Sequence, residues 1–151
     1  MQLTLVRHGE AHPAQHEPDE KRALTERGHA QAQETAAAIH PWIQPEVFVV
    51  SPLVRAQQTL AYLQTYFPNV PVVVCDAIKP EDDAKVAIEW LSHLPYESIA
   101  VVCHMNVVAY MEQILLQQPF HVFQLAEARV YEQAVIAAGL STRTQQFIPQ
   151  A

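Results

Sequence analysis

Four residues suited to phosphoryl transfer stand at or near the ends of apolar, strand-like runs. Arg7 and His8 follow the first run, Arg55 comes a few residues after the second, and His104 follows the fourth. In open α/β sheets, ligands bind at the carboxyl ends of the strands, where residues from distant parts of the chain meet. We therefore expect these four side chains to gather at one edge of a sheet.

The residue types indicate a covalent mechanism. A neutral imidazole is nucleophilic near pH 7, which makes His8 the predicted nucleophile. Guanidinium groups match the geometry and charge of phosphate, so Arg7 and Arg55 are predicted to bind the phosphoryl oxygens, and His104 can donate a hydrogen bond to them. A structural histidine and surface arginines in ion pairs are the plainer alternatives. A shared sheet edge makes those alternatives less favoured.

A further cation and a mobile loop lie near the first helix. Arg22 precedes the helix expected to begin after Thr25, where backbone amides are available to an anion. We predict that Arg22 binds substrate, with ordinary solvation as an equally good interpretation. The polar loop 12–21, interrupted by Pro13 and Pro18, is the segment most expected to move.

The other candidate ligands do not indicate a metal or a cofactor. The remaining six histidines follow no spacing that builds a metal site on one face. Cys75 and Cys103 have no partner at metal or redox spacing, so we predict two reduced, buried thiols. Only three glycines occur, too few for the phosphate loops of nucleotide-binding folds. We predict no metal and no cofactor.

The elements that must position these residues alternate along the chain. Runs rich in Val and Ile predict buried parallel strands over 3–6, 47–50, 70–75 and 99–103, each followed by a segment of helical periodicity. Ser51 and Pro52 are predicted to be the N-cap and first residue of the second helix. Segments 130–138 and 142–148 predict a hairpin with its turn at Gly139.

This order predicts an α/β fold: a three-layer α/β/α sandwich whose sheet is mostly parallel, with an antiparallel C-terminal edge. The 151 residues, half of them apolar, predict a single domain over 1–151. A net charge of −7 argues against nucleic acid or anionic membranes as partners. No apolar run approaches the roughly 20 residues of a membrane helix, and we find no signal peptide, so we expect a cytoplasmic protein.

Taken together, the motifs resemble those of a known family. They are Arg7-His8-Gly9, Leu24-Thr25-Glu26-Arg27-Gly28, Ser51-Pro52-Leu53-Val54-Arg55-Ala56-Gln57-Gln58-Thr59, and His104 after the fourth strand. In this order they are similar to the histidine phosphatase superfamily, which includes phosphoglycerate mutases and acid phosphatases. The resemblance implies that His8 is phosphorylated, that Arg7, Arg55 and His104 form the phosphate pocket, and that Gly9 contacts substrate. The length and the context of Arg22 look most like short SixA-type phosphohistidine phosphatases, although those often have proline in place of Ala23.

The proton donor is not assigned. The candidates are Glu10, Asp19, Glu81, Asp82 and Asp83, each more plainly a solvated carboxylate. Larger relatives carry the acid on an insertion after the third strand, where this chain has room for one helix. An imidazole leaves a phosphoramidate with little acid assistance, so we predict phosphohistidine in a protein as the substrate. The alternatives are a small-molecule phosphomonoesterase and a catalytically silent phosphate-binding module; nothing indicates the enclosed site of a mutase.

Overall fold

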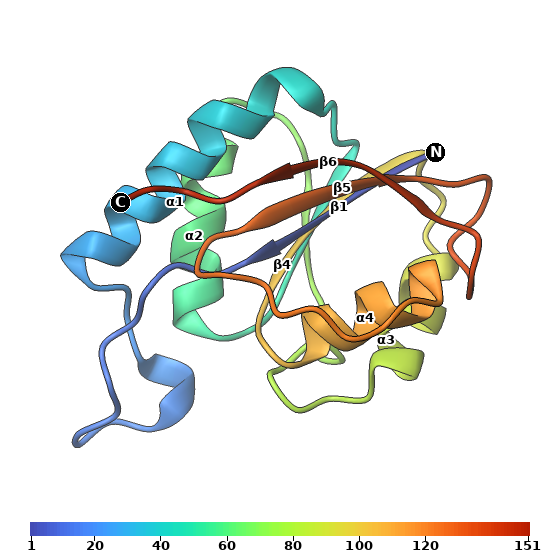
Figure 1. Cartoon of the computed structure of the whole chain (residues 1–151). Helices are drawn as coiled ribbons and strands as arrows, with labels where there is room; N and C mark the ends of the chain where they lie inside the picture. The colour runs from blue at the N-terminus through green and yellow to red at the C-terminus, as the bar shows by residue number, and fades with distance from the viewer.

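A computed structural model describes all 151 residues and shows one sheet between two pairs of helices (Figure 1). The strands are β1 (Gln2–Arg7), β2 (Val47–Val50), β3 (Val72–Val74), β4 (Ser98–Cys103), β5 (Ala128–Glu132) and β6 (Thr142–Phe147). The helices are α1 (Glu26–Ile39), α2 (Val54–Gln64), α3 (Ala84–Ser92) and α4 (Val107–Leu116), with short 3-10 turns η1 (Asp19–Lys21) and η2 (His40–Trp42).

The strand order is β3-β2-β4-β1-β5-β6. The first four strands pair in parallel, whereas β5 pairs antiparallel with β1 and β6 antiparallel with β5. This confirms the predicted three-layer sandwich and its antiparallel C-terminal edge. None of the helices has the length and apolar character needed to cross a membrane.

The central strands are buried on both faces because two separate cores cover them. Leu3 and Leu5 of β1 pack into a core shared with α3 and α4, and Val6 packs into the core shared with α1 and α2. Successive side chains of a strand point to opposite faces, so a continuous apolar run supplies both cores. The runs at 3–6 and 99–103 are therefore strands buried on both faces, as predicted.

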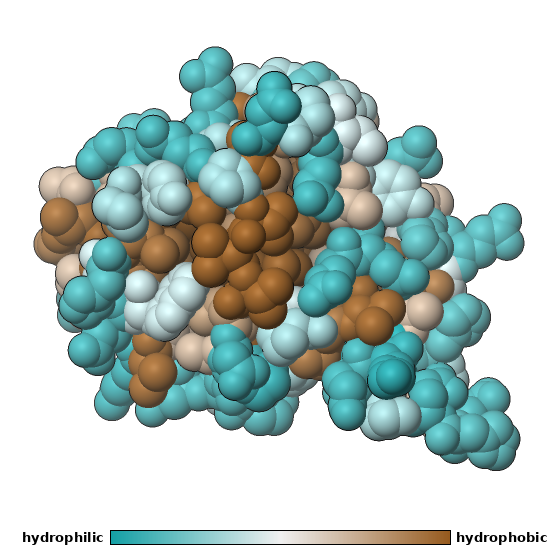
Figure 2. Space-filling view, turned by 180° about the vertical axis from the view of Figure 1, so that it is seen from behind, coloured by the Kyte–Doolittle hydropathy of each residue, from teal (hydrophilic) through white to brown (hydrophobic).

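The third strand is shorter and more exposed than predicted. The run 70–75 was expected to be buried, but only Val72–Val74 forms β3, and Val72 and Val74 are 40% and 55% exposed. β3 lies at the edge of the sheet, where no further strand covers it. Figure 2 shows that apolar surface gathers over part of the face opposite to the view of Figure 1. An apolar run does not reveal whether its strand lies in the centre or at the edge of the sheet.

Two other predicted boundaries were wrong. α2 begins at Val54 with Leu53 as its N-cap, because the Ser51 side chain is engaged elsewhere, between the Leu53 N–H and His104. The C-terminal strands pair as a hairpin, but β5 begins at Ala128 and ends at Glu132, so residues 133–141 form a long loop instead of a tight turn at Gly139.

The first helix begins where it was predicted, and its start is held close to β1. The Thr25 side chain caps α1 by accepting a hydrogen bond from the Gly28 N–H. Gly28 lies against the segment that leaves β1: a Cβ at Gly28 would stand 2.0 Å from the Glu10 carbonyl oxygen, and one at Gly9 would stand 2.5 Å from the Gly28 carbonyl oxygen. Only glycine permits this backbone approach.

We therefore expect Gly28→Ala to lower the free energy of unfolding by about 1–3 kcal/mol, because the new methyl group overlaps backbone that has no room to move. Urea unfolding followed by circular dichroism measures the loss. The exposed Ala37→Ser on the same helix is the control and should change stability by under about 0.5 kcal/mol. Equal stability of Gly28→Ala and wild type would contradict the close approach.

Candidate functional site

The register of the parallel strands brings three chain segments to one edge of the sheet. Arg7 pairs with Cys103, and Val50 pairs with Val102, so His8 and His104 leave the sheet at the same level and Ser51 leaves it one residue earlier. The ring centroids of His8 and His104 lie 5.0 Å apart although 96 positions separate them in sequence. The structure thus brings the two predicted histidines together.

His8 is buried and held in one tautomer. Its Nδ1 lies 2.6 Å from the Gly9 carbonyl oxygen, which can only accept, so Nδ1 carries the hydrogen. Nε2 then presents a lone pair, to which the Nε–H of Arg55 donates at 3.3 Å. Burial and the nearby charges of Arg55 and Arg7 lower the pKa of His8 to about 3, against a partial opposing effect of the Gly9 carbonyl. His8 is therefore a neutral imidazole at physiological pH.

His104 is also buried and neutral. Burial, followed by the neighbouring His8 and Arg55, lowers its pKa well below the usual range. Its Nε2 lies 2.7 Å from Ser51 Oγ, which already accepts from the Leu53 N–H. The Ser51 hydroxyl can thus donate to Nε2, which leaves the hydrogen of His104 on Nδ1. That Nδ1 is buried and has no partner.

The two predicted phosphate-binding arginines are partly committed to the protein. Arg55 is only 4% exposed and donates from Nη1 to the Asp19 carbonyl oxygen at 2.9 Å. Arg7 donates from Nη1 to the Phe123 carbonyl oxygen at 2.7 Å, but its Nε is buried without a partner. Burial lowers the pKa of both guanidinium groups. The charges of both arginines nevertheless act on His8, and the Nε of Arg7 is left without an acceptor.

An acidic residue from the polar loop, Asp19, forms ion pairs with two arginines, Arg55 and Arg22. The Asp19 carboxylate lies 3.2 Å from Arg55 Nη2 and 2.9 Å from Arg22 Nη1. The hydrogen bond from Arg22 and the charge of Arg55 lower the pKa of Asp19, so the carboxylate is ionised. Arg22 also donates to the His12 carbonyl oxygen at 2.6 Å. Arg22 is therefore joined to the site through Asp19 and is not simply solvated.

The other candidate carboxylates lie outside this cluster. Glu10 accepts from the Thr25 hydroxyl, and Glu81 accepts from Asn106. Asp82 accepts from the Lys79 N–H, and Asp83 caps α3. Among the five candidates, Asp19 alone touches a residue predicted to bind phosphate. Its ionised state makes it a poor proton donor while these contacts persist.

Several supporting residues were not foreseen. The Gly9 N–H donates to Thr59 Oγ1 at 3.1 Å, and the Thr59 hydroxyl donates to the Arg55 carbonyl oxygen, so one side chain ties the Gly9 turn to α2. Ser51 orients His104, although the sequence suggested only a helix cap. The sequence feature that could have indicated this role is the position of Ser51 directly after a buried strand. No group of three or more His, Cys, Asp or Glu side chains is arranged to hold a metal ion.

The lowered pKa of His8 predicts acid sensitivity. His8 is neutral in the folded protein down to about pH 3, but the unfolded chain takes up a proton below about pH 6.5. Since the unfolded state binds the extra proton, stability falls as pH drops through this window, by at most roughly 1.4 kcal/mol per pH unit for one such histidine. Urea unfolding from pH 7 to pH 4 should give a shallower slope for His8→Asn than for wild type. Parallel slopes would contradict the shifted pKa.

Known structures share this fold. A protein histidine phosphatase SixA, solved with tungstate, is 24% identical with a TM-score of 0.86, and the match covers 99% of this chain and 97% of that one. A protein described as phosphohistidine phosphatase SixA from Agrobacterium tumefaciens is 21% identical with a TM-score of 0.84 over 98% and 97%. The α-ribazole phosphatase of Shigella flexneri is 16% identical with a TM-score of 0.76 over 100% and 96%.

The sequence itself carries the family signature. No curated protein sequence matches the chain significantly. The model of the histidine phosphatase superfamily, branch 1, matches residues 3–79, which include the first strand, the first two helices and the residues around His8 and Arg55. This match spans half of the chain, and the full-length structural similarity agrees with it. The chain belongs to the histidine phosphatase superfamily.

Proposed function

We propose that this protein is a phosphatase that transfers a phosphoryl group from its substrate to Nε2 of His8 and then to water. Membership of the superfamily and the phosphatases among its structural relatives support phosphatase activity. The observation that carries the residue roles is a neutral His8 in contact with Arg55 and His104, together with two buried donors, Arg7 Nε and His104 Nδ1, that have no partner. Buried donors without partners cost about 1–3 kcal/mol each, a cost that an oxyanion would relieve.

The reaction divides into two displacements at phosphorus. The lone pair of His8 Nε2 forms a bond to phosphorus as the bond to the leaving group breaks, and the leaving group departs with a proton taken from solvent. Water then attacks the phosphorylated His8, gives up a proton to solvent, and releases inorganic phosphate and the free imidazole. The Gly9 carbonyl holds the hydrogen on Nδ1 throughout and stabilises the positive charge that develops on the ring.

Arg7, Arg55 and His104 stabilise the charge on the three equatorial oxygens. The Nε of Arg7 and the Nδ1 of His104 already lack partners, and Arg55 becomes available when the anion takes its donors from the Asp19 carboxylate and from His8 Nε2. These groups supply positive charge and fixed donors, so the proposed reaction requires no metal. Gly9 and Arg22 contribute at the margin of the same pocket.

We propose phosphohistidine in a protein as the substrate. The segment between β3 and β4 holds only α3, so no insertion encloses the site or adds a carboxylate. Arg7 also lines an open groove of about 390 Å³, whose other lining residues include the polar Arg27, Gln124 and Gln150 and the apolar Leu125 and Ile148. Such a groove suits a polypeptide around the phosphorylated side chain. The free buried cysteines support a reducing, cytoplasmic location.

A small-molecule phosphomonoesterase is the second candidate. The structural similarity to an α-ribazole phosphatase favours it. An alkoxide leaving group needs a proton, and the ionised Asp19 is poorly placed to give one. We therefore rank this activity below hydrolysis of phosphohistidine.

A trapping experiment tests the nucleophile. Wild-type protein is mixed with a radiolabelled phosphohistidine protein or an aryl phosphate and quenched in alkaline SDS, because acid cleaves the phosphorus–nitrogen bond. Label should stay on wild type and on His93→Ala, which changes an exposed histidine, and should be absent from His8→Ala. Label on His8→Ala would exclude His8 as the phosphorylated residue. An unlabelled wild type with both substrates would favour the binding module.

Initial rates test the substrate class. We expect kcat/KM for the phosphohistidine protein to exceed that for a small alkyl phosphate by roughly 100-fold or more, since general acid assistance contributes about that much to loss of an alkoxide. The aryl phosphate, with its better leaving group, should fall between them. Efficient turnover of the alkyl ester alone would sink the proposal of a protein substrate.

Binding of inorganic tungstate tests the competition with Asp19. Asp19→Asn should bind tungstate about 3- to 10-fold more tightly, because the carboxylate no longer competes for Arg55 and Arg22. Glu20→Gln removes the same charge from the same turn without touching either arginine and should leave the affinity near that of wild type. Isothermal titration measures both. Weaker binding by Asp19→Asn would show that Asp19 instead holds Arg55 in place.

A further inference from the structure

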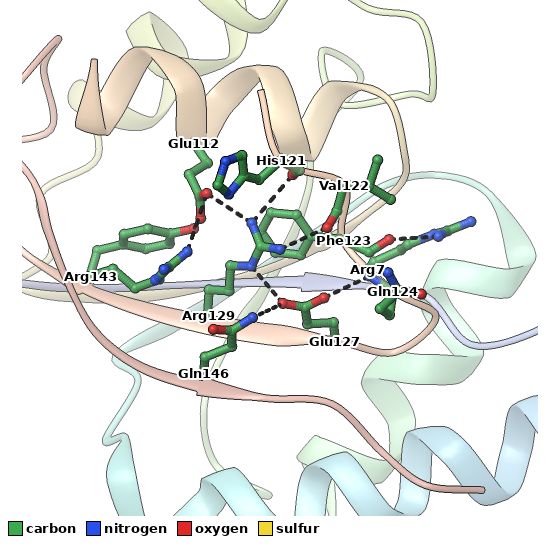
Figure 3. Close-up of polar contacts among 11 residues, drawn as sticks. Arg7, Glu112, His121, Val122, Phe123, Gln124, Glu127, Arg129, Arg143 and Gln146 are labelled. Atoms are coloured by element: carbon green, nitrogen blue, oxygen red, sulfur yellow. Dashed lines mark hydrogen bonds and ion pairs between the residues drawn. The ribbon is translucent and has the colours of Figure 1, made fainter. Parts of the chain in front are cut away.

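A buried ionic network lies next to the proposed phosphate pocket and centres on Arg129 of β5 (Figure 3). Arg129 Nε lies 2.6 Å from Glu127 Oε2, and Arg129 Nη1 lies 2.8 Å from Glu112 Oε1. No side chain of this trio is more than 5% exposed. The Tyr131 hydroxyl donates to the second oxygen of Glu112. Burial lowers the pKa of Arg129, but its bonds to Glu127 and Glu112 outweigh burial and raise it. 

A gain in stability does not by itself explain why these charges are buried. Burying ions carries a large desolvation cost, and apolar replacements of similar shape are often as stable. The other hydrogen bonds of the Arg129 guanidinium suggest a different role, because they go to one irregular segment, 121–124. Nη2 donates to the Val122 carbonyl oxygen at 2.8 Å, Nη1 lies 3.4 Å from that of His121, and the guanidinium carbon stands 3.8 Å from the centre of the Phe123 ring.

Glu127 holds the other end of the same segment. Its Oε1 accepts from the Gln124 N–H at 2.7 Å while its Oε2 binds Arg129. Residues 117–127 contain no helix or strand. The segment is therefore held by the contacts of Arg129 and Glu127 and not by the backbone hydrogen bonds of a helix or sheet. The segment is therefore clamped from both sides by one ion pair.

The clamped segment in turn holds Arg7. The Phe123 carbonyl oxygen accepts from Arg7 Nη1 at 2.7 Å, and the Glu127 carbonyl oxygen accepts from the Arg7 backbone N–H at 3.0 Å. Figure 3 shows the chain of contacts running from Glu112 through Arg129 and the segment to Arg7. The bond to Phe123 is the one hydrogen bond of the Arg7 side chain, whose Nε stays unpartnered.

We propose that Arg129 is a positioning residue for Arg7. By fixing segment 121–124, it holds the Phe123 carbonyl where it orients the Arg7 guanidinium toward a tetrahedral oxyanion beside His8. Arg129 itself touches no substrate. The inference rests on the phosphate-binding role of Arg7 in the proposed function.

Arg129→Lys tests this role, because lysine keeps the charge that neutralises Glu112 and Glu127 but loses the planar fork that also reaches Val122 and Phe123. We expect tungstate to bind about 10-fold more weakly than to wild type, the effect of misplacing one charge-assisted hydrogen bond. In an Arg7→Ala background, adding Arg129→Lys should cause no further loss. A merely structural role would not produce this dependence on Arg7. Circular dichroism and thermal unfolding establish that each variant is folded at the titration temperature.

Two further variants complete the design. Arg143→Lys alters an arginine that contacts Glu112 at 3.5 Å on the far side of the network, and it should leave tungstate binding unchanged. If Arg129→Lys does not fold, Phe123→Leu replaces it, since it removes the ring under the guanidinium and leaves both ion pairs intact. Its loss of affinity should be about 3- to 10-fold and should also vanish in the Arg7→Ala background.

The outcomes separate the two proposals. Tungstate binding that is unchanged in the folded variant, or that falls equally with and without Arg7, would overturn the positioning role alone. Failure of wild type to bind tungstate would overturn the phosphate pocket, and the positioning role with it. Loss of affinity in the folded variant only when Arg7 is present would support the inference.

Discussion

The backbone hydrogen bonds between β1, β4 and β2 fix the level at which three chain segments leave the sheet. Parallel pairing of Arg7 with Cys103 and of Val50 with Val102 sets this level, and a shift of one residue would move each side chain of a strand into the opposite core. The site inherits this register. His8 and His104 meet, and Ser51 reaches His104, because the strands that precede them end together.

The interior of the site gives up some stability for function. Burial and the neighbouring arginines hold two imidazoles neutral, and Arg7 Nε and His104 Nδ1 have no partner. A core built only for stability would pair these atoms. If the proposed site binds a phosphoryl group, these donors are already in position for its oxygens.

Two kinds of carboxylate act on the two arginines of the pocket. Asp19 stands on a polar loop, has a side chain 55% exposed, and binds Arg55 directly. Glu127 is 1% exposed; its carbonyl oxygen accepts from the Arg7 N–H and its carboxylate binds Arg129. The exposed carboxylate is the one that we propose substrate displaces, whereas the buried one is fixed by the core. The difference follows from the solvent access of each ion pair.

The sequence by itself determined the alternating elements, the cap at Thr25 and the place of Arg7, His8, Arg55 and His104 at or near strand ends, because apolar period and strand-end position are local properties. Tertiary structure alone decided the marginal place of β3, the engagement of Ser51 with His104, and the contacts of Asp19 with Arg22 and Arg55. It also decided the network of Arg129, whose partners come from a helix, a strand and an irregular loop. Long side chains meet across elements only after the backbone has packed, and no spacing along the chain records where their charged ends arrive.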